Sequence, residues 1–227
     1  MNKGSYNLSA VSCKLKIKSH WLKTTNFEFS IAILMFIALV FLGCVKQEIK
    51  NINSAGKNIV CFGDSVTFGY GVEEKDSYPA QLARMLNKPV INSGIDGNTS
   101  SDALNRIEED VLSKDPYLVV VEFGGNDFLT KIPIKDTESN VRQIIDKILA
   151  KGSMVALADV SAGFVLSEYR PVYAKIAREK GVVLIPGLLK GIITNPKMKS
   201  DFFHPNPQGY KLIAYRILRQ IKPYIKN

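Results

Sequence analysis

Short apolar runs alternate with amphipathic stretches along most of this chain. Five runs are rich in Val, Ile, Leu, Phe and Ala, and they lie at residues 58–63, 89–94, 117–125, 154–160 and 182–187. Between and after them, apolar residues recur with the 3.6-residue period of a helix, at residues 78–87, 100–113, 138–152, 166–181 and 207–225. Strands that are apolar on both faces and followed by helices predict a parallel sheet between two helical layers, a three-layer α/β/α sandwich.

The region before the first strand has a different pattern. Residues 29–44 are an uncharged apolar run, as long as the core of a secretory signal but shorter than a membrane span of roughly 20 residues. We therefore predict a signal peptide or membrane-targeting segment at 1–43, a polar tether at 44–57 and a folded domain at 58–227.

The end of the apolar run, Phe41-Leu42-Gly43-Cys44, is similar to the lipobox of bacterial lipoproteins. This resemblance implies that the signal is cut before Cys44 and that Cys44 carries a lipid. The alternative is an uncleaved signal anchor in which Cys44 is an ordinary residue. Either version predicts a domain held outside the cytoplasm, in the bacterial cell envelope, by a membrane anchor.

Charge and cysteine content narrow the possible partners. The net charge is +9, from 30 Lys and Arg against 21 Asp and Glu, and residues 1–43 contribute +4 of it. The remaining basic residues are too scattered for a nucleic-acid-binding surface. Of three cysteines, Cys13 lies in the targeting segment, Cys44 is the predicted lipid site and Cys61 lies in an apolar strand. We therefore expect no disulfide and no bound metal or cofactor in the mature domain.

Catalytic residues are expected just after the strands, because ligands of such sheets bind outside the carboxyl ends of the strands. Ser65 follows the first strand, Gly94 ends the second, Asn126 follows the third, and Asp201 and His204 precede the last helix. A serine hydroxyl becomes a good nucleophile when a base removes its proton and a third group orients that base. This set therefore predicts a serine hydrolase.

Each of these residues has a role in that prediction. Ser65 is the expected nucleophile and His204 the base, since the only other histidine, His20, lies in the targeting segment. Asp201, three residues before His204, is expected to accept its Nδ1 proton. The expected oxyanion donors are the N–H groups of Ser65 and Gly94 and the side chain of Asn126. Taken singly, each residue could instead be a helix cap or turn residue.

Four segments together resemble the signature blocks of the SGNH (GDSL) hydrolases. They are Gly63-Asp64-Ser65, Gly94 within NSGIDGNTS, Gly124-Gly125-Asn126-Asp127, and Asp201-x-x-His204 within DFFHPNPQGY. FGDSVTFGYGV, SYPAQL and FGGND are similar to the branch that contains bacterial arylesterases and the multifunctional thioesterase/lysophospholipase. The resemblance implies a flavodoxin-like sheet of five parallel strands in the order 2-1-3-4-5, and it assigns the same catalytic roles as above.

The sequence thus predicts an extracytoplasmic serine esterase that hydrolyses small carboxylic esters or thioesters through an acyl-enzyme. A carbohydrate or peptidoglycan O-deacetylase using the same triad is one alternative. A non-catalytic binding lipoprotein of the envelope is another. Residues 159–170 show no motif that would fix the substrate.

Overall fold

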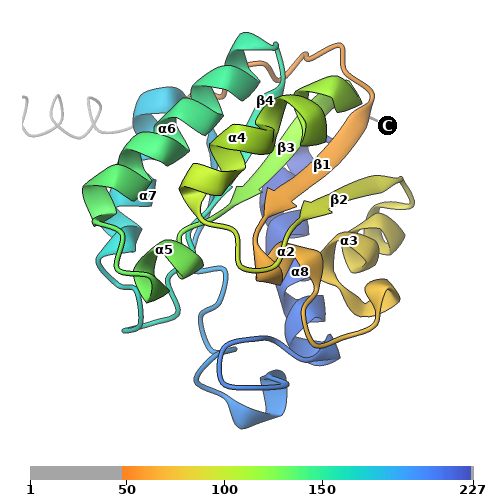
Figure 1. Cartoon of the computed structure of the whole chain (residues 1–227). Coiled ribbons are helices and arrows are strands. Elements are labelled where there is room, and N and C mark those ends of the chain that lie inside the picture. The colour runs from red at the N-terminus through yellow and green to blue at the C-terminus, as the bar shows by residue number, and fades with distance from the viewer. Residues whose placement is uncertain (1–47, 226–227) are drawn as a thin grey trace, which may run out of the picture. The chain divides into compact units, whose positions relative to one another are not determined.

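A sheet of five parallel strands forms the centre of this computed structural model, which describes residues 48–225. The strands are β1 (Asn58–Gly63), β2 (Val90–Gly94), β3 (Pro116–Glu122), β4 (Met154–Ala158) and β5 (Val183–Ile185). Their order across the sheet is β2-β1-β3-β4-β5, with every neighbouring pair parallel (Figure 1). The predicted fold class and strand order are confirmed.

Helices cover both faces of the sheet, which explains why the central strands β1, β3 and β4 are mainly apolar on both faces. The main helices are α3 (Tyr78–Leu86), α4 (Ser100–Asp110), α6 (Ile134–Ala150), α7 (Tyr169–Lys180) and α8 (Pro207–Ile221). Ile59 and Cys61 of β1 face α3 and α8, whereas Val60 and Phe62 of the same strand face α4, α6 and α7 (Figure 1). Alternate side chains of one strand therefore enter two separate apolar cores.

Shorter helices follow the strands or join the larger elements. Two α-helical turns come directly after the strands at the centre of the sheet, α2 (Ser65–Phe68) after β1 and α5 (Gly125–Leu129) after β3. The 3₁₀ turns are η1 (Glu74–Asp76), η2 (Leu112–Lys114), η3 (Pro196–Met198) and η4 (Lys222–Tyr224). α2 and α5 place the candidate residues Ser65 and Asn126 at the same edge of the sheet.

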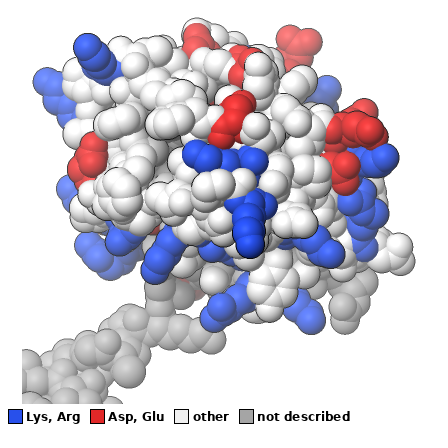
Figure 2. All heavy atoms as spheres, turned by 90° about the horizontal axis from the view of Figure 1, so that it is seen from below, with Lys and Arg blue, Asp and Glu red and all other residues white. Residues whose placement is uncertain are grey.

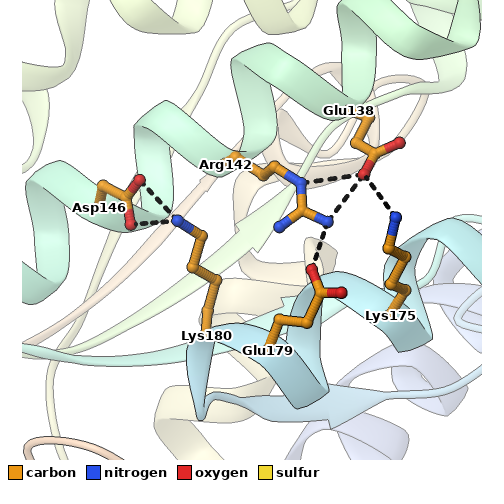
Figure 3. Close-up of polar contacts among 6 residues, drawn as sticks. All are labelled: Glu138, Arg142, Asp146, Lys175, Glu179 and Lys180. Carbon is orange, nitrogen blue, oxygen red and sulfur yellow. Dashed lines mark hydrogen bonds and ion pairs between the residues drawn. The ribbon is translucent and has the colours of Figure 1, made fainter.

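Ion pairs join the exposed sides of α6 and α7 (Figure 3). Arg142 lies between Glu138 of its own helix, at 2.8 Å, and Glu179 of α7, at 2.7 Å. One turn further along, Lys180 of α7 contacts Asp146 of α6 at 2.7 Å. Exposed pairs stabilise a fold by only about 0–1 kcal/mol each. These ion pairs add to the buried contacts between α6 and α7, and together the two sets of contacts fix the position of α7 beside α6.

The described chain begins at the amino ends of β4 and β5. The N–H of Lys50 donates to the carbonyl of Gly181, at 2.8 Å, and the side chain of Asn51 donates to the carbonyls of Leu149 and Ser153, each at 3.0 Å. The segment expected to be a tether up to residue 57 is therefore packed on the domain from Lys50 onward. Among residues 48–225, no helix combines the length and hydropathy needed to cross a bilayer. The predicted targeting segment and Cys44 lie outside the described residues.

Candidate active site

Ser65 is the first residue of α2, at the carboxyl end of β1. Asp64 caps this helix, because its side chain accepts a hydrogen bond from the N–H of Val66 at 3.0 Å. As at the start of any helix, the N–H of Ser65 has no partner in the preceding turn. The Ser65 side chain is only 7% exposed. Its hydroxyl and its N–H are thus held at a fixed place at the sheet edge.

His204 approaches Ser65 from the loop before α8. Its Nε2 lies 3.1 Å from Oγ of Ser65, and its Nδ1 lies 2.8 Å from Oδ2 of Asp201. The other oxygen of Asp201, Oδ1, accepts from the N–H groups of Phe203 and His204, each at 2.8 Å. The structure therefore brings together the serine, histidine and aspartate expected from the sequence.

Two contacts prepare His204 to act as a base. Partial burial opposes ionisation of Asp201, but hydrogen bonds from the ring and N–H of His204 and from Phe203 outweigh it and lower the pKa of Asp201. The carboxylate is thus charged at neutral pH and holds the proton of His204 on Nδ1, which leaves Nε2 to accept a proton from Ser65. The ring of Tyr70 covers the imidazole, with the ring centroids 4.4 Å apart.

Asn126 lies in α5 and lines the same cavity as Ser65 and His204. α5 follows directly from β3 through Gly124, whose φ of 122° is open only to glycine. Asp127 fixes the turn, since its carboxylate accepts from the N–H and hydroxyl of Ser100 and, at 3.0 Å, from the hydroxyl of Thr137. One N–H of the Asn126 side chain donates to the carbonyl of Asn98 at 3.0 Å. Its second N–H has no partner among the described residues.

The structure gives Gly94 a packing role that the sequence did not indicate. Its N–H donates to Oδ1 of Asn92 at 3.0 Å, so this N–H is engaged rather than free for an oxyanion. A side chain here would place Cβ 2.1 Å from the N atom of Phe68, so only glycine lets β2 lie against α2. Gly97, three residues later, is flanked by Asp96, which lines the cavity, and by Asn98, which binds Asn126.

A buried acidic residue, Glu122, is the part of the site that the sequence analysis missed. It ends β3 and is 1% exposed. Burial raises its pKa well above the ordinary value, and burial also raises the pKa of neighbouring Asp64, to about 6. The sequence feature that could have identified Glu122 is its lone carboxyl group at the end of the apolar run YLVVVE, where burying a charge is costly.

The triad opens into a mainly apolar cavity of about 180 Å³. Nine of its sixteen lining residues are apolar, among them Val66, Leu166, Leu189, Ile193 and Phe203. Ala162 and Val165 line the same cavity and pair with each other, so the segment after β4 forms part of its wall. A cavity of this composition suits the hydrocarbon part of a ligand next to a polar reacting group.

The surface around the cavity is also rich in apolar groups. Of ten large apolar side chains exposed within residues 48–225, eight lie in segments that follow the carboxyl ends of strands. They are Phe68, Tyr70, Ile95, Phe128, Leu129, Phe164, Phe202 and Phe203. Figure 2 views the molecule from the side where the loop between β5 and α8 projects, and acidic groups there are confined to the upper half of the view.

Comparison with known proteins agrees with this geometry. The sequence model of the GDSL-like lipase/acylhydrolase family matches residues 61–212. The arylesterase of Vibrio mimicus is 28% identical over 83% of this chain and 98% of its own length. Thioesterase 1/protease 1/lysophospholipase L1 of Escherichia coli K12 is 29% identical, over 77% and 88% respectively. The crystal structure of TesA superposes with a TM-score of 0.69 at 25% identity, covering 74% of this chain and all of that one.

Two further matches concern the location and the alternative substrates. The uncharacterized lipoprotein YqeF of Bacillus subtilis is 32% identical over 42% of this chain and 39% of its own length. The crystal structure of the acetyl xylan esterase AlAXEase superposes with a TM-score of 0.63 at 25% identity, over 72% of this chain and 98% of that one.

Proposed function

The chain belongs to the GDSL-like lipase/acylhydrolase family and is a serine hydrolase that acts on esters, and on this premise we propose that Ser65, His204 and Asp201 are its catalytic triad. The observation that supports this most directly is the chain of contacts from Ser65 Oγ to His204 Nε2, at 3.1 Å, and from His204 Nδ1 to Asp201, at 2.8 Å. These are hydrogen-bond distances suited to proton transfer.

The reaction then proceeds through an acyl-enzyme. Oγ of Ser65 forms a bond to the carbonyl carbon while its proton passes to Nε2 of His204, and Asp201 stabilises the resulting imidazolium. When the tetrahedral intermediate collapses, the bond to the leaving oxygen or sulfur breaks and His204 returns the proton to it. Water repeats the sequence on the acyl-serine, which releases the carboxylic acid and restores Ser65.

Negative charge on the carbonyl oxygen needs donors already aimed at it. We propose the N–H of Ser65 and the second side-chain N–H of Asn126 for two of them. Gly94 was the third residue expected from the sequence, but its N–H is engaged by Asn92. The N–H of Gly97 has no acceptor among the described residues, and its neighbour Asn98 binds Asn126. Gly97 is therefore the better third donor.

The cavity favours carboxylic esters or thioesters with an apolar acyl or aryl group. Two relatives are named as an arylesterase and a lysophospholipase, and these names describe enzymes that act on esters of that kind. An O-deacetylase remains the second candidate because the neighbouring acetyl xylan esterase has the same fold at similar coverage. A p-nitrophenyl ester series distinguishes them, since an apolar acyl site gives a higher kcat/KM for butyrate or octanoate than for acetate.

An alkylphosphonate ester tests the nucleophile assignment by forming a stable covalent adduct with an activated serine. We expect mass spectrometry to find the added mass only on the peptide that contains Ser65, and His204→Ala to slow the labelling strongly. In a crystal structure of the adduct, the phosphonyl oxygen should lie within hydrogen-bond distance of Ser65 N, Asn126 Nδ2 and Gly97 N. No label, or a label on another serine, would contradict the assignment. An oxygen bound to Gly94 N would restore that residue as the third donor.

We also propose that the domain is held outside the cytoplasm by an anchor at Cys44, as the lipobox-like sequence suggests and a lipoprotein relative supports. Five residues lie between Cys44 and Lys50, and the six Cα-to-Cα steps span about 20 Å at most when fully extended. Lys50 is bound at the amino ends of the strands, whereas the triad lies at their carboxyl ends, roughly 23 Å further along the seven-residue β3. The first described residues thus lie at the edge of the sheet opposite the triad.

Labelled palmitate and cell fractionation test this location. The full chain is expected to incorporate the lipid and to remain in the membrane fraction, and Cys44→Ser to lose the lipid. Membrane retention of both proteins without any lipid label would instead favour the uncleaved signal anchor.

A further inference from the structure

Two carboxyl groups are buried together beneath Ser65, and the triad uses neither of them. Asp64 is 2% exposed and Glu122 is 1% exposed. Their side chains hydrogen-bond to each other, and both residues line the catalytic cavity. Two adjacent carboxyl groups out of contact with water cannot both ionise, because desolvation and their mutual repulsion oppose a second charge.

Glu122 has surroundings that suit a protonated carboxyl group. Its Oε2 accepts a hydrogen bond from the hydroxyl of Thr67 at 2.9 Å, and Tyr78 OH lies 2.9 Å from the same hydroxyl. No Lys or Arg side chain pairs with Glu122 among the described residues. A Cβ on Gly63 would lie 2.7 Å from Oε2 of Glu122, so the glycine before Asp64 makes room for this carboxyl.

Asp64 has surroundings that suit the anion. It accepts from the N–H of Val66 at 3.0 Å and from Glu122, and it interacts electrostatically with His204. A negative charge on Asp64 would therefore favour the imidazolium that His204 becomes when it removes the proton of Ser65. Asp64 is thus a second carboxylate acting on His204, in addition to Asp201, which accepts the hydrogen bond from Nδ1 of His204.

We propose that Asp64 and Glu122 hold one proton between them, with Glu122 the donor and Asp64 the anion, and that this pair positions Ser65 and stabilises the protonated form of His204. The proposal rests on the proposed triad but adds two positioning residues to it. The proton stays between the two carboxyl groups during turnover, so it is neither consumed nor released.

The pair should make the reaction sensitive to mildly acidic pH. Because burial raises the pKa of Asp64 to about 6, Asp64 gains a proton as the pH falls through that value, and its effect on His204 is lost below it. The other titratable groups that act on the pair are Asp127 from α5, Tyr78 from α3, Tyr173 from α7 and Tyr210 from α8, besides His204 itself.

Asp64→Asn separates a charge effect from simple helix capping. Asparagine caps a helix as well as aspartate does, so α2 and the melting temperature should be preserved. We expect kcat to fall about tenfold at pH 7.5 with little change in KM, because the imidazolium loses a stabilising negative charge. The contribution near pH 6 to the acidic limb of kcat should disappear. An unchanged rate and pH profile would show that Asp64 is only a cap and would overturn the proposal.

Variants of Glu122 identify which group carries the proton. Glu122→Gln keeps a neutral donor toward Asp64 and an acceptor for Thr67, so it should retain at least a third of the activity. Glu122→Leu removes the donor and should shift the acidic limb to higher pH. If Glu122 were the anion instead, Glu122→Gln would lose as much activity as Asp64→Asn.

Infrared spectroscopy tests the shared proton without any assay of activity. The wild-type domain at pH 7.5 should show the carbonyl band of a buried protonated carboxyl group, and Glu122→Gln should lack it. Absence of that band in the wild type refutes the proposal even if the ester substrates prove to be wrong. Presence of the band in an enzyme that fails to label at Ser65 would support the shared proton and contradict only the triad.

Discussion

Ser65→Ala is expected to lower kcat/KM for p-nitrophenyl butyrate by about 10³-fold to 10⁶-fold, as removal of the nucleophile does in serine hydrolases. Within residues 48–225 the Ser65 hydroxyl makes one hydrogen bond, to His204 at 3.1 Å, so its removal should leave folding intact. His204→Ala should lose a similar factor, and the double variant little more, because the two residues act as one unit. The measurement is initial rate on the purified domain, with melting temperature recorded for each variant.

Ser139→Ala is a matched control for this experiment. Ser139 is an exposed serine on α6, outside the cavity, and its replacement should change neither the rate nor the melting temperature. If Ser65→Ala keeps more than a tenth of the activity while folded, Ser65 is not the nucleophile. If the folded wild type hydrolyses no ester faster than the variants do, the non-catalytic binding protein becomes the better description.

The fold could be predicted because nearly every residue of β1, β3 and β4 is buried on whichever face of the sheet it points to. Such strands appear as continuous apolar runs, and the helices that cover them repeat their apolar residues every 3.6 positions. The 3.6-residue period does not detect short helices. α2 and α5 are one turn long, so they have no measurable period, and their positions depend on contacts such as the cap from Asp64.

The residues of the candidate triad could be predicted because the choices were few. His204 is the single histidine of the domain, and parallel strands end at one edge. The oxyanion donors were harder to predict, since a backbone N–H is defined by orientation rather than residue type. Gly94 ends β2 and Gly97 lies three residues later in the following loop, and the sequence alone does not distinguish them as donors. The contact between Gly94 and Asn92 separates them, and it follows from how β2 packs on α2.

Glu122 was missed for a different physical reason. Its environment consists of Thr67, Tyr78 and Asp64, two of which come from elements that follow β1, while Glu122 ends β3. Only the pairing of β1 with β3 brings Gly63 opposite Glu122 and places the carboxyl beside them. A lone acidic residue after an apolar run gives no indication of its partners until the register of the sheet is known.

Asp201→Asn is expected to reduce kcat by about 10³-fold to 10⁴-fold while leaving the fold intact, because it reverses the tautomer of His204. Oδ1 of Asp201 accepts two N–H groups, from Phe203 and His204 at 2.8 Å, so the carbonyl oxygen of asparagine should occupy that position. Its NH₂ group then points at Nδ1 of His204 and donates to it. The ring proton must move to Nε2, which faces Ser65 and can no longer accept the serine proton.

The same substitution also tests whether Asp201 acts by orienting the ring of His204 or only by its negative charge. A buffer base such as free imidazole should restore little activity to Asp201→Asn, since the ring still fills the site, but it should partly rescue His204→Ala, where the space is open. In Asp201→Asn, NMR of ¹⁵N-labelled imidazole nitrogens should find the proton on Nε2. A variant that retains the Nδ1 proton and more than a tenth of wild-type kcat would show that Asp201 does not set the tautomer. The backbone turn of residues 201–204 would then be sufficient to orient His204.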